Sequence, residues 1–354
     1  MLKQRVVTVA LTFILTSLVS LRAAEITLLT WPDYISQSVL DEFYRQSNIQ
    51  VKQVYYDSDD ARDKLLNLSR GHGYDVILTS RVRLPMYIQL GWLETYQQSK
   101  LPNIQHLSPK WHEAANEFGQ YCIPYFWGTI GILYNKKYIS SPPTSWRVFF
   151  NQLPQYSGKV NLLNDSRTLL PMALIAAGFN SHSNQQQEIN QAATLIHKHL
   201  AHINSFSALS LEQENRLNNE QIWISMAYNG DALYLKSLNP DLEFIQPTDG
   251  TNAWLDCLTI SKASRHKNSV HQFINFLLLP KNALELAQQL QYPTPNLTAY
   301  KQLPLSIRQN HTLYPKLSKN VQLNQVIAPS TERYFQITYK QLVFAHKQLA
   351  QDKP

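Results

Sequence analysis

The sequence predicts an α/β protein with two lobes, each built on a mainly parallel sheet that is flanked by helices. The first observation is an alternation of short apolar runs with amphipathic segments, at residues 25–30, 36–47, 49–55, 59–69 and 75–78. Strands that alternate with helices in this way form parallel sheets covered by helices. The second observation is that the alternation recurs between residues 159 and 260, and a chain of 354 residues is long enough for two hydrophobic cores.

Each element of the first lobe has its own signal. The helix at 36–47 places its apolar residues on one face, and the helix at 59–69 repeats that pattern and ends before Gly71. Residues 49–55 and 75–78 are short runs with several Ile and Val residues, which favour strands. Together with the first strand, these segments form one strand-helix-strand-helix-strand unit.

The second lobe repeats this order with a longer helical part. Residues 159–163 and 221–228 are predicted strands, and helices are expected at 166–177 and from about Asp231. Residues 188–202 also have the spacing of an amphipathic helix. We therefore expect a second sheet with helices on its faces.

The remaining chain predicts one further strand and several helices. Residues 256–260 form an apolar run, and the helix at 268–279 is expected to begin at Asn268 as its N-cap and to stop at Pro280. Beyond Tyr300 the chain reads as mostly helical.

The first residues predict export. Lys3 and Arg5 precede an uncharged, mostly apolar run at 6–21, and a small residue follows at Ala23. This is the layout of a cleaved signal peptide, here residues 1–23. A transmembrane anchor is the alternative, but it needs roughly 20 apolar residues, and this run is shorter and interrupted by Thr and Ser. We predict a periplasmic protein.

Charge and cysteine count exclude several classes of protein. The formal net charge of +7 falls to about +4 when Lys3, Arg5 and Arg22 leave with the signal peptide. The basic residues are scattered without a run of like charge, so we expect no nucleic-acid partner. Two cysteines, Cys122 and Cys257, are too few for a disulfide scaffold or a CxxC metal motif.

Aromatic rings and carboxylates stand at the expected carboxyl ends of the strands, where open α/β sheets form their binding sites. The residues concerned are Trp31, Asp33, Tyr34, Ser80, Asp165, Tyr228, Asp231, Trp254, Asp256 and Tyr292. An ammonium group has three donors and no acceptor, so carboxylates bind it with charge-assisted hydrogen bonds. Ring faces attract the same cation by roughly 0.5–2 kcal/mol each. This pattern predicts an alkylammonium ligand.

Each of these residues also has a structural interpretation. Asp165, Asp231 and Ser80 precede predicted helices and could act as N-caps alone. The tryptophans and Tyr228 could be core residues, and Tyr292 could shape a proline-rich turn. The binding interpretation rests on their expected position at one edge.

At these residues the sequence resembles the periplasmic spermidine/putrescine-binding proteins of polyamine ABC transporters, over nearly the whole mature chain. The segments that carry the resemblance are TWPDY at 30–34, YDVI at 74–77, IPYFWG at 123–128, SW at 145–146, YSGK at 156–159, YNGD at 228–231, INFLL at 274–278 and YPTPN at 292–296. Their order and spacing together are specific, although no single segment is.

The resemblance implies a type II-like periplasmic binding protein with two lobes joined by hinge strands. It implies lobe 1 at 24–125 and 256–300, and lobe 2 at 126–255 and 301–354 with C-terminal helices. It also implies that the ten residues named above line an interlobe cleft, with Gln322 from the tail completing the site. A monomer without cofactor that closes on a polyamine and delivers it to a membrane permease is then expected.

The chain departs from the family at positions that contact the ligand. Spermidine binders have Glu where Thr168 stands, Tyr at Val82, and Thr or Ser at Pro32. Asp231 and Asp33 match putrescine-selective members better. We therefore expect putrescine to be preferred over spermidine.

Hinge strands run side by side in this family, and the two cysteines lie close to the expected crossovers. The resemblance therefore predicts that Cys122 and Cys257 are neighbours and form a disulfide; the alternative is two buried free thiols.

Other functions fit the sequence less well. An enzyme is disfavoured, because the helix residues His197, His199 and His202 do not share one face and no nucleophile motif occurs. The same fold could bind iron through tyrosines or bind thiamine. It could also serve as a ligand sensor or an adhesin, because fold does not fix function.

Overall fold

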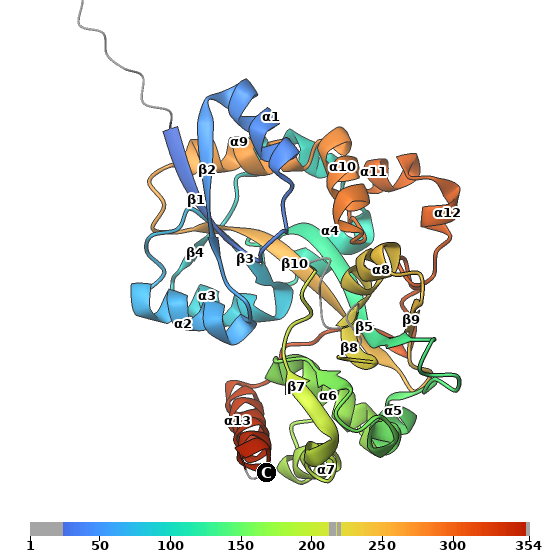
Figure 1. Cartoon of the computed structure of the whole chain (residues 1–354). Coiled ribbons are helices and arrows are strands. Elements are labelled where there is room, and N and C mark those ends of the chain that lie inside the picture. Colours follow the sequence, from blue (N-terminus) through green and yellow to red (C-terminus); the bar gives the residue numbers. More distant parts are fainter. Residues whose placement is uncertain (1–23, 212–216, 218–220, 352–354) are drawn as a thin grey trace, which may run out of the picture.

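The computed structural model describes residues 24–211, 217 and 221–351, so the predicted signal peptide lies outside the described residues. Its elements form an upper and a lower group, and β5 and β10 pass from one group to the other (Figure 1). Among the described residues, no helix is long and apolar enough to cross a membrane.

The strands belong to one continuous, curled sheet in the order β2-β1-β3-β10-β5-β8-β6-β7. Their bounds are β1 Ala24–Thr30, β2 Ile49–Tyr55, β3 Val76–Ser80, β4 Leu93–Glu94, β5 Ile123–Asn135, β6 Val160–Leu162, β7 Ile203–Phe206, β8 Ile224–Tyr228, β9 Leu242–Ile245, β10 Thr251–Ser261 and β11 Val321–Leu323. Strands β2, β1 and β3 are parallel, as are β7, β6 and β8. The predicted α/β class with two mainly parallel parts is confirmed.

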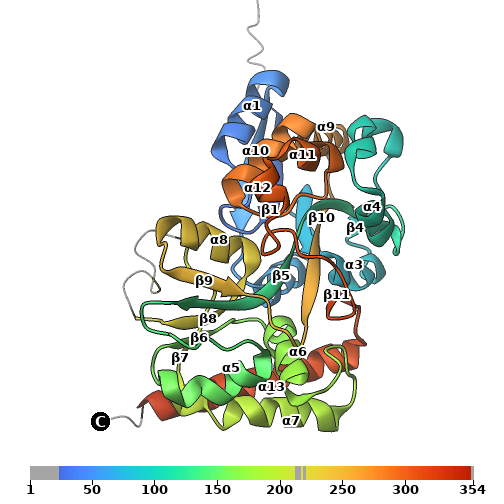
Figure 2. The same ribbon diagram turned by 90° about the vertical axis from the view of Figure 1, so that its right-hand side faces the viewer.

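Helices cover both parts of the sheet. In the upper group these are α1 Gln37–Ser47, α2 Asp59–Ser69, α3 Leu84–Gln89, α4 Pro109–Asn116, α9 Lys267–Leu277, α10 Pro280–Leu290, α11 Leu297–Gln302 and α12 Leu305–Arg308. In the lower group they are α5 Trp146–Gln152, α6 Ser166–Ala177, α7 Gln186–His197, α8 Asn229–Leu238 and α13 Pro329–Gln351 (Figure 2). Short 3₁₀ turns lie at Arg81–Arg83, Gln98–Lys100, Pro102–His106, Leu153–Tyr156 and Leu200–His202. We call the upper group the first lobe and the lower group the second; the residue boundaries given above stay a prediction.

Strands β5 and β10 form the connection between the lobes. Residues 123–129 of β5 pair antiparallel with β10, and residues 130–135 pair with β8 and β9 of the second lobe. The expected hinge strands therefore lie side by side. Cys122 and Cys257 are joined by a disulfide, with Cα atoms 5.0 Å apart, so the bridged alternative is the one present.

Several elements match the predicted bounds residue for residue, namely 49–55, 59–69 and 166–177. Helix α2 begins where predicted because the Ser58 side chain accepts a hydrogen bond from the backbone N–H of Ala61. The face of α1 made by Val39, Leu40 and Phe43 is buried, and Phe43 packs on Phe273 of α9 at 5.0 Å between ring centroids.

Three helix predictions are wrong in detail. The N-cap of α9 is His266, so Asn268 lies inside the helix. The helix predicted to run to residue 279 does stop before Pro280, but its last residue is Leu277, and Pro280 begins α10 because a proline without N–H is tolerated there. The predicted helix at 188–202 ends at His197, and a 3₁₀ turn leads into β7.

Candidate functional site

Four aromatic rings form a row where the two lobes meet. Tyr34 of the first lobe lies 5.6 Å from Tyr292, Tyr292 lies 5.4 Å from Trp254 on β10, and Trp254 lies 6.0 Å from Tyr228 at the end of β8, all measured between ring centroids. Each pair meets edge to face, the arrangement that the ring quadrupole favours. The row therefore runs from one lobe across a hinge strand to the other lobe.

Carboxylates of both lobes attach to this row. The Tyr34 hydroxyl donates a 3.0 Å hydrogen bond to Asp256 Oδ2, and the Tyr292 hydroxyl donates to Asp231 of α8. At the far end, the Tyr228 hydroxyl shares a 3.1 Å hydrogen bond with Thr168 Oγ1. The bond from Tyr292 to Asp231 joins the two lobes directly.

Burial raises the pKa of each carboxyl group at this row. The pKa of Asp256 is raised to about 7 by burial and by the negative charge of Asp59, against the Tyr34 hydrogen bond and Arg62. Burial and Asp59 likewise raise the pKa of Asp165 to about 7, and burial raises the pKa of Asp231 to about 6. A cation beside these groups would restore the ionised form, so the site suits a positively charged ligand.

The comparisons with known proteins agree with this chemistry. A family model described as bacterial extracellular solute-binding protein matches residues 38–311. The chain belongs to this family. The solute-binding protein is 28% identical over 313 residues to a spermidine/putrescine-binding periplasmic protein of Salmonella typhimurium, covering 86% of this chain and 89% of that relative. It is also 28% identical over 305 residues to a putrescine-binding periplasmic protein of Pseudomonas aeruginosa, covering 80% and 82%.

A solved structure supports the same family fold. A putative spermidine/putrescine ABC transporter protein from Listeria monocytogenes superposes with a TM-score of 0.83 at 25% identity, covering 90% of this chain and 98% of that one. The family resemblance drawn from the sequence segments, and the two-lobed fold it implied, are therefore confirmed for this solute-binding protein.

The remaining residues predicted to bind the ligand have other neighbours in the structure. Trp31 follows β1, is half-buried and packs edge-on against Tyr56 at 4.5 Å between ring centroids. Ser80 ends β3 directly opposite Asp256 in the antiparallel register. Asp165 is the N-cap of α6 and accepts a 2.7 Å hydrogen bond from the backbone N–H of Arg167.

Two predicted residues point elsewhere. Asp33 is exposed in the turn after β1, at a positive φ of 54°. Gln322 on β11 is exposed, and its side-chain amide donates to the Lys319 carbonyl oxygen at 2.7 Å. Asp231 is not an N-cap, because α8 begins two residues earlier, at Asn229, and its N-cap is Tyr228.

Three residues that pack against the row are not among those predicted from the sequence. Tyr125 and Phe126 pack against Tyr34 at 5.7 and 5.5 Å, and the Tyr125 hydroxyl donates to the Tyr34 carbonyl oxygen at 2.8 Å. Both lie in the segment IPYFWG, whose aromatic content was a usable signal. Gly128 opposite Trp254 was missed because its role is to leave space: a β-carbon there would lie 2.6 Å from Trp254 Cζ2.

The register of the hinge strands changes beside Asp256. Between Leu255 and Cys257 the pairing of β10 with β5 shifts by one residue, so three steps on β5 oppose two on β10. Bulges of this kind redirect a side chain and often border functional sites. Cys257 directly follows Asp256 in the chain and is bridged to Cys122. The disulfide therefore fixes the backbone that carries Asp256.

The histidines considered for an enzyme do not form a site with these groups. The rings of His199 and His202 are 6.3 Å apart, and His202 Nδ1 lies 3.0 Å from Ser157 Oγ. Within the part of the chain that the structure describes, no group of three His, Cys, Asp or Glu side chains is arranged to hold a metal ion.

Proposed function

We propose that this solute-binding protein is exported to the periplasm, binds a polyamine between its lobes as a monomer, and delivers it to the permease of an ABC transporter without converting it chemically. The observation that carries the proposal is the row of four rings with buried carboxylates contributed by both lobes. The two relatives, which are named as spermidine/putrescine-binding and putrescine-binding proteins, support the ligand class.

A diamine suits the two ends of this arrangement. One ammonium group would pair with Asp256, next to the first lobe, and the other would pair with Asp231 or Asp165 in the second lobe. The methylene chain would lie against Tyr292 and Trp254, where apolar contact and cation–π attraction act together. A ligand that binds carboxylates of both lobes has higher affinity for the closed arrangement and therefore favours closure.

The ligand enters only when the lobes part. Trp254 and Tyr292 are 8% and 7% exposed, and the rings touch each other directly. Hinge motion at β5 and β10 would separate Tyr292 from Asp231 and expose the row. The Tyr292 hydroxyl would then give up its hydrogen bond to Asp231 and form a new one at the bound ligand.

Ligand length follows from Thr168. This residue forms a neutral hydrogen bond with Tyr228 where spermidine binders of the resembled family have a carboxylate. A middle or third amine would therefore lack an ionic partner there, and removing a charge from water without a partner is costly. We propose that putrescine binds more tightly than spermidine.

Calorimetric titration with several candidate ligands tests this proposal. Purified mature protein would be titrated calorimetrically with putrescine, cadaverine, spermidine, thiamine and ferric iron. The proposal expects heat with the polyamines, strongest affinity for putrescine, and a micromolar or tighter constant, which corresponds to roughly 8 kcal/mol. Binding of thiamine or iron with no response to any polyamine would overturn it.

A further inference from the structure

Arg167 of the second lobe inserts its guanidinium group among three aspartates of the first lobe. It lies in the first turn of α6, and its Nη atoms contact Asp59 Oδ2 at 2.8 Å, Asp63 Oδ2 at 2.9 Å and Asp60 Oδ1 at 3.4 Å. The three aspartates stand in the first two turns of α2. Arg167 and these residues are more than 100 positions apart in the chain, so only the approach of the lobes brings them together.

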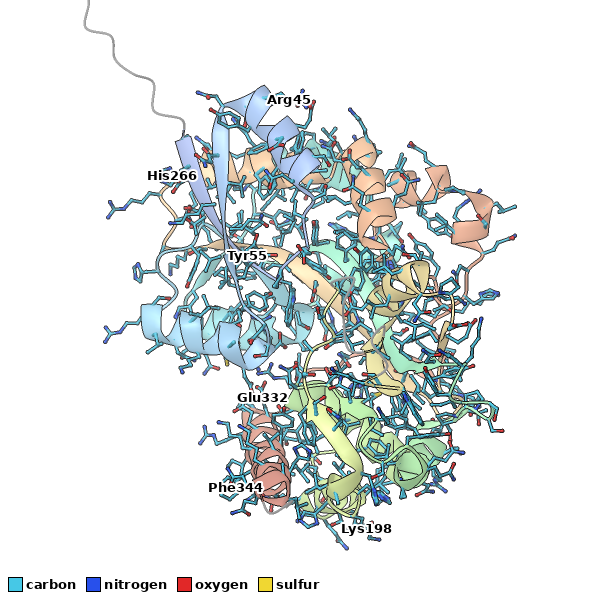
Figure 3. All side chains as sticks on the ribbon, in the orientation of Figure 1. Arg45, Tyr55, Lys198, His266, Glu332 and Phe344 are labelled. Carbon is cyan, nitrogen blue, oxygen red and sulfur yellow. A yellow bond between two sulfur atoms is a disulfide. The ribbon has the colours of Figure 1, made fainter. Side chains whose placement is uncertain are left out.

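A second arginine makes the reverse connection. Arg83 of the first lobe pairs with Glu332 in the first turn of α13, which packs on α6 and α7 of the second lobe. Glu332 also accepts from Arg167 Nε, and Gln336 on the next turn donates to Asp60 at 3.0 Å. Figure 3 shows Glu332 at the end of α13 that faces α2.

The side chains that form these ion pairs are mostly sheltered from solvent. The side chains of Arg167, Asp59, Asp63 and Glu332 are 10–15% exposed. Burial alone would raise the pKa of Asp59, but the guanidinium groups of Arg62 and Arg167 lower it to about 2. Ion pairs in such surroundings are screened less by salt than pairs on the open surface.

We propose that this network, Arg167 with Asp59, Asp60 and Asp63 and Arg83 with Glu332, is an electrostatic latch that holds the two lobes together before any ligand binds. Arg167 is thereby a positioning residue: it draws α6, whose N-cap is Asp165, toward the first lobe. This inference deepens the proposed function and rests on it for its effect on polyamine affinity.

The pairing pattern allows the latch to open without leaving an arginine unpaired. When the lobes separate, Arg62 keeps Asp59 and Arg83 keeps Asp63 within the first lobe, while Arg167 keeps Glu332 within the second. Of the ion pairs in this network, opening breaks only those of Arg167 with α2 and of Arg83 with Glu332; the hydrogen bond from Gln336 to Asp60 breaks with them. The free-energy cost of opening is therefore the difference between two states in which each arginine is paired. A cost of this kind suits a reversible switch better than a permanent lock.

The latch also connects to the ligand site through Asp59. The charge of Asp59 raises the pKa of both Asp165 and Asp256, so a change in the pairing of Asp59 is felt by both carboxyl groups. Arg167 offsets that charge only while the lobes touch.

Small-angle X-ray scattering of the ligand-free protein tests the latch without depending on the identity of the ligand. The samples are wild type, Arg167→Met, which keeps the aliphatic stem, and Asp60→Asn, whose side chain is 37% exposed and hence tolerant of change. Arg45→Met is the matched control, because Arg45 pairs with Glu42 inside α1 and is 69% exposed. Each is measured at about 10 mM and about 1 M NaCl, where the Debye length falls from roughly 30 Å to roughly 3 Å.

We expect wild type and Arg45→Met to be compact in low salt and to expand only in part in high salt, because sheltered ion pairs are screened less than exposed ones. Arg167→Met should be expanded in both, with Asp60→Asn in between, while circular dichroism and melting temperature show that all fold. Equal radii of gyration for wild type, Arg167→Met and Asp60→Asn would overturn the latch.

Putrescine binding by the same variants gives the second readout. Because affinity scales with the fraction of molecules already in the competent state, Arg167→Met should weaken binding by about tenfold. The loss should appear mainly in the dissociation rate. Absence of polyamine binding in the wild type would refute the proposed function while the scattering result still decides the latch; unchanged putrescine kinetics in Arg167→Met would refute the positioning role.

Discussion

Gly230 in the second lobe lies so close to Tyr292 in the first lobe that a β-carbon at Gly230 would stand 2.4 Å from Tyr292 Cε1. No substituent fits at this point of contact. Gly230 is in the first turn of α8 and has a negative φ, so the reason for glycine is space between the lobes and not backbone conformation.

Gly230→Ala should therefore impair closure without impairing folding. Alanine is favoured over glycine in a helix by about 1 kcal/mol, which offsets the loss of the lobe contact, so the melting temperature of the ligand-free protein should change little. Putrescine affinity should fall by more than about tenfold, because the lobes cannot reach the ligand-bound arrangement. Calorimetry and differential scanning fluorimetry check the two parts; full affinity in Gly230→Ala would mean that the observed lobe contact is not the one formed with ligand.

Asp256→Asn tests the central carboxylate. The change keeps the shape of the side chain and the hydrogen bond to Tyr34, but it leaves an ammonium group without its ionic partner in a buried site. Affinity for putrescine should fall by more than roughly tenfold. Asp33→Asn is the control, since Asp33 is exposed, and should bind nearly as wild type. Equal affinities in the two variants would remove Asp256 from the site.

The raised pKa values of Asp165, Asp256 and Asp231 predict a pH dependence with a definite sign. The three pKa values lie at about 6 to about 7, so these groups are largely protonated at pH 5 and ionised at pH 8. Putrescine affinity should therefore increase between pH 5 and pH 8. Asp256→Asn should reduce the slope. A flat affinity profile between pH 5 and 8 would contradict the assignment of these carboxylates to the ligand.

The same shifts affect the ligand-free protein in the opposite direction. Their pKa values in the folded state exceed the ordinary value of 3.8, so the folded protein holds more protons than the unfolded chain between about pH 4 and pH 7. Their contribution to stability is present below that window and is lost as the pH rises through about 7. The melting temperature of the ligand-free protein should therefore be lower at pH 8 than it would be without these pKa shifts. Added putrescine should raise it again, because the ligand pairs with the ionised carboxylates.

The disulfide should stabilise the hinge. It closes a segment of 135 residues, and both sulfur-bearing residues are fully buried. Changing both cysteines to alanine should lower the free energy of unfolding by roughly 2–4 kcal/mol. Urea denaturation measures this, and putrescine affinity should fall as well because Asp256 neighbours Cys257. Unchanged stability and affinity in the double variant would show that β5 and β10 hold Asp256 without the bridge.

Local signals allow much of the fold to be predicted. Helix α2 is predicted correctly because its apolar residues have helical spacing and a glycine follows it, and in the structure Ser58 caps its start. Strand β5 is not predicted as an element, because Pro124, Gly128 and Gly131 interrupt any strand pattern in 13 residues that are nearly all buried. Its need for glycines comes from Trp254 and Phe244, which pack on it from other strands.

The site is predictable only as far as one-dimensional patterns reach. The aromatic and acidic residues at strand ends can be found because strand ends share an edge. Only the family resemblance predicts Gln322 as a site residue, and in the structure its side-chain amide donates to the Lys319 carbonyl oxygen. The Arg167 network is invisible in the sequence, because its partners on α2 and α13 depend on how the lobes meet and no local pattern encodes that.

The crystal structure of the mature protein with putrescine tests the account most directly. We predict one ammonium group within hydrogen-bonding distance of Asp256 and the other on Asp231 or Asp165, with the methylene chain against Tyr292 and Trp254. A diamine located outside these rings, or contacting none of these carboxylates, would contradict it.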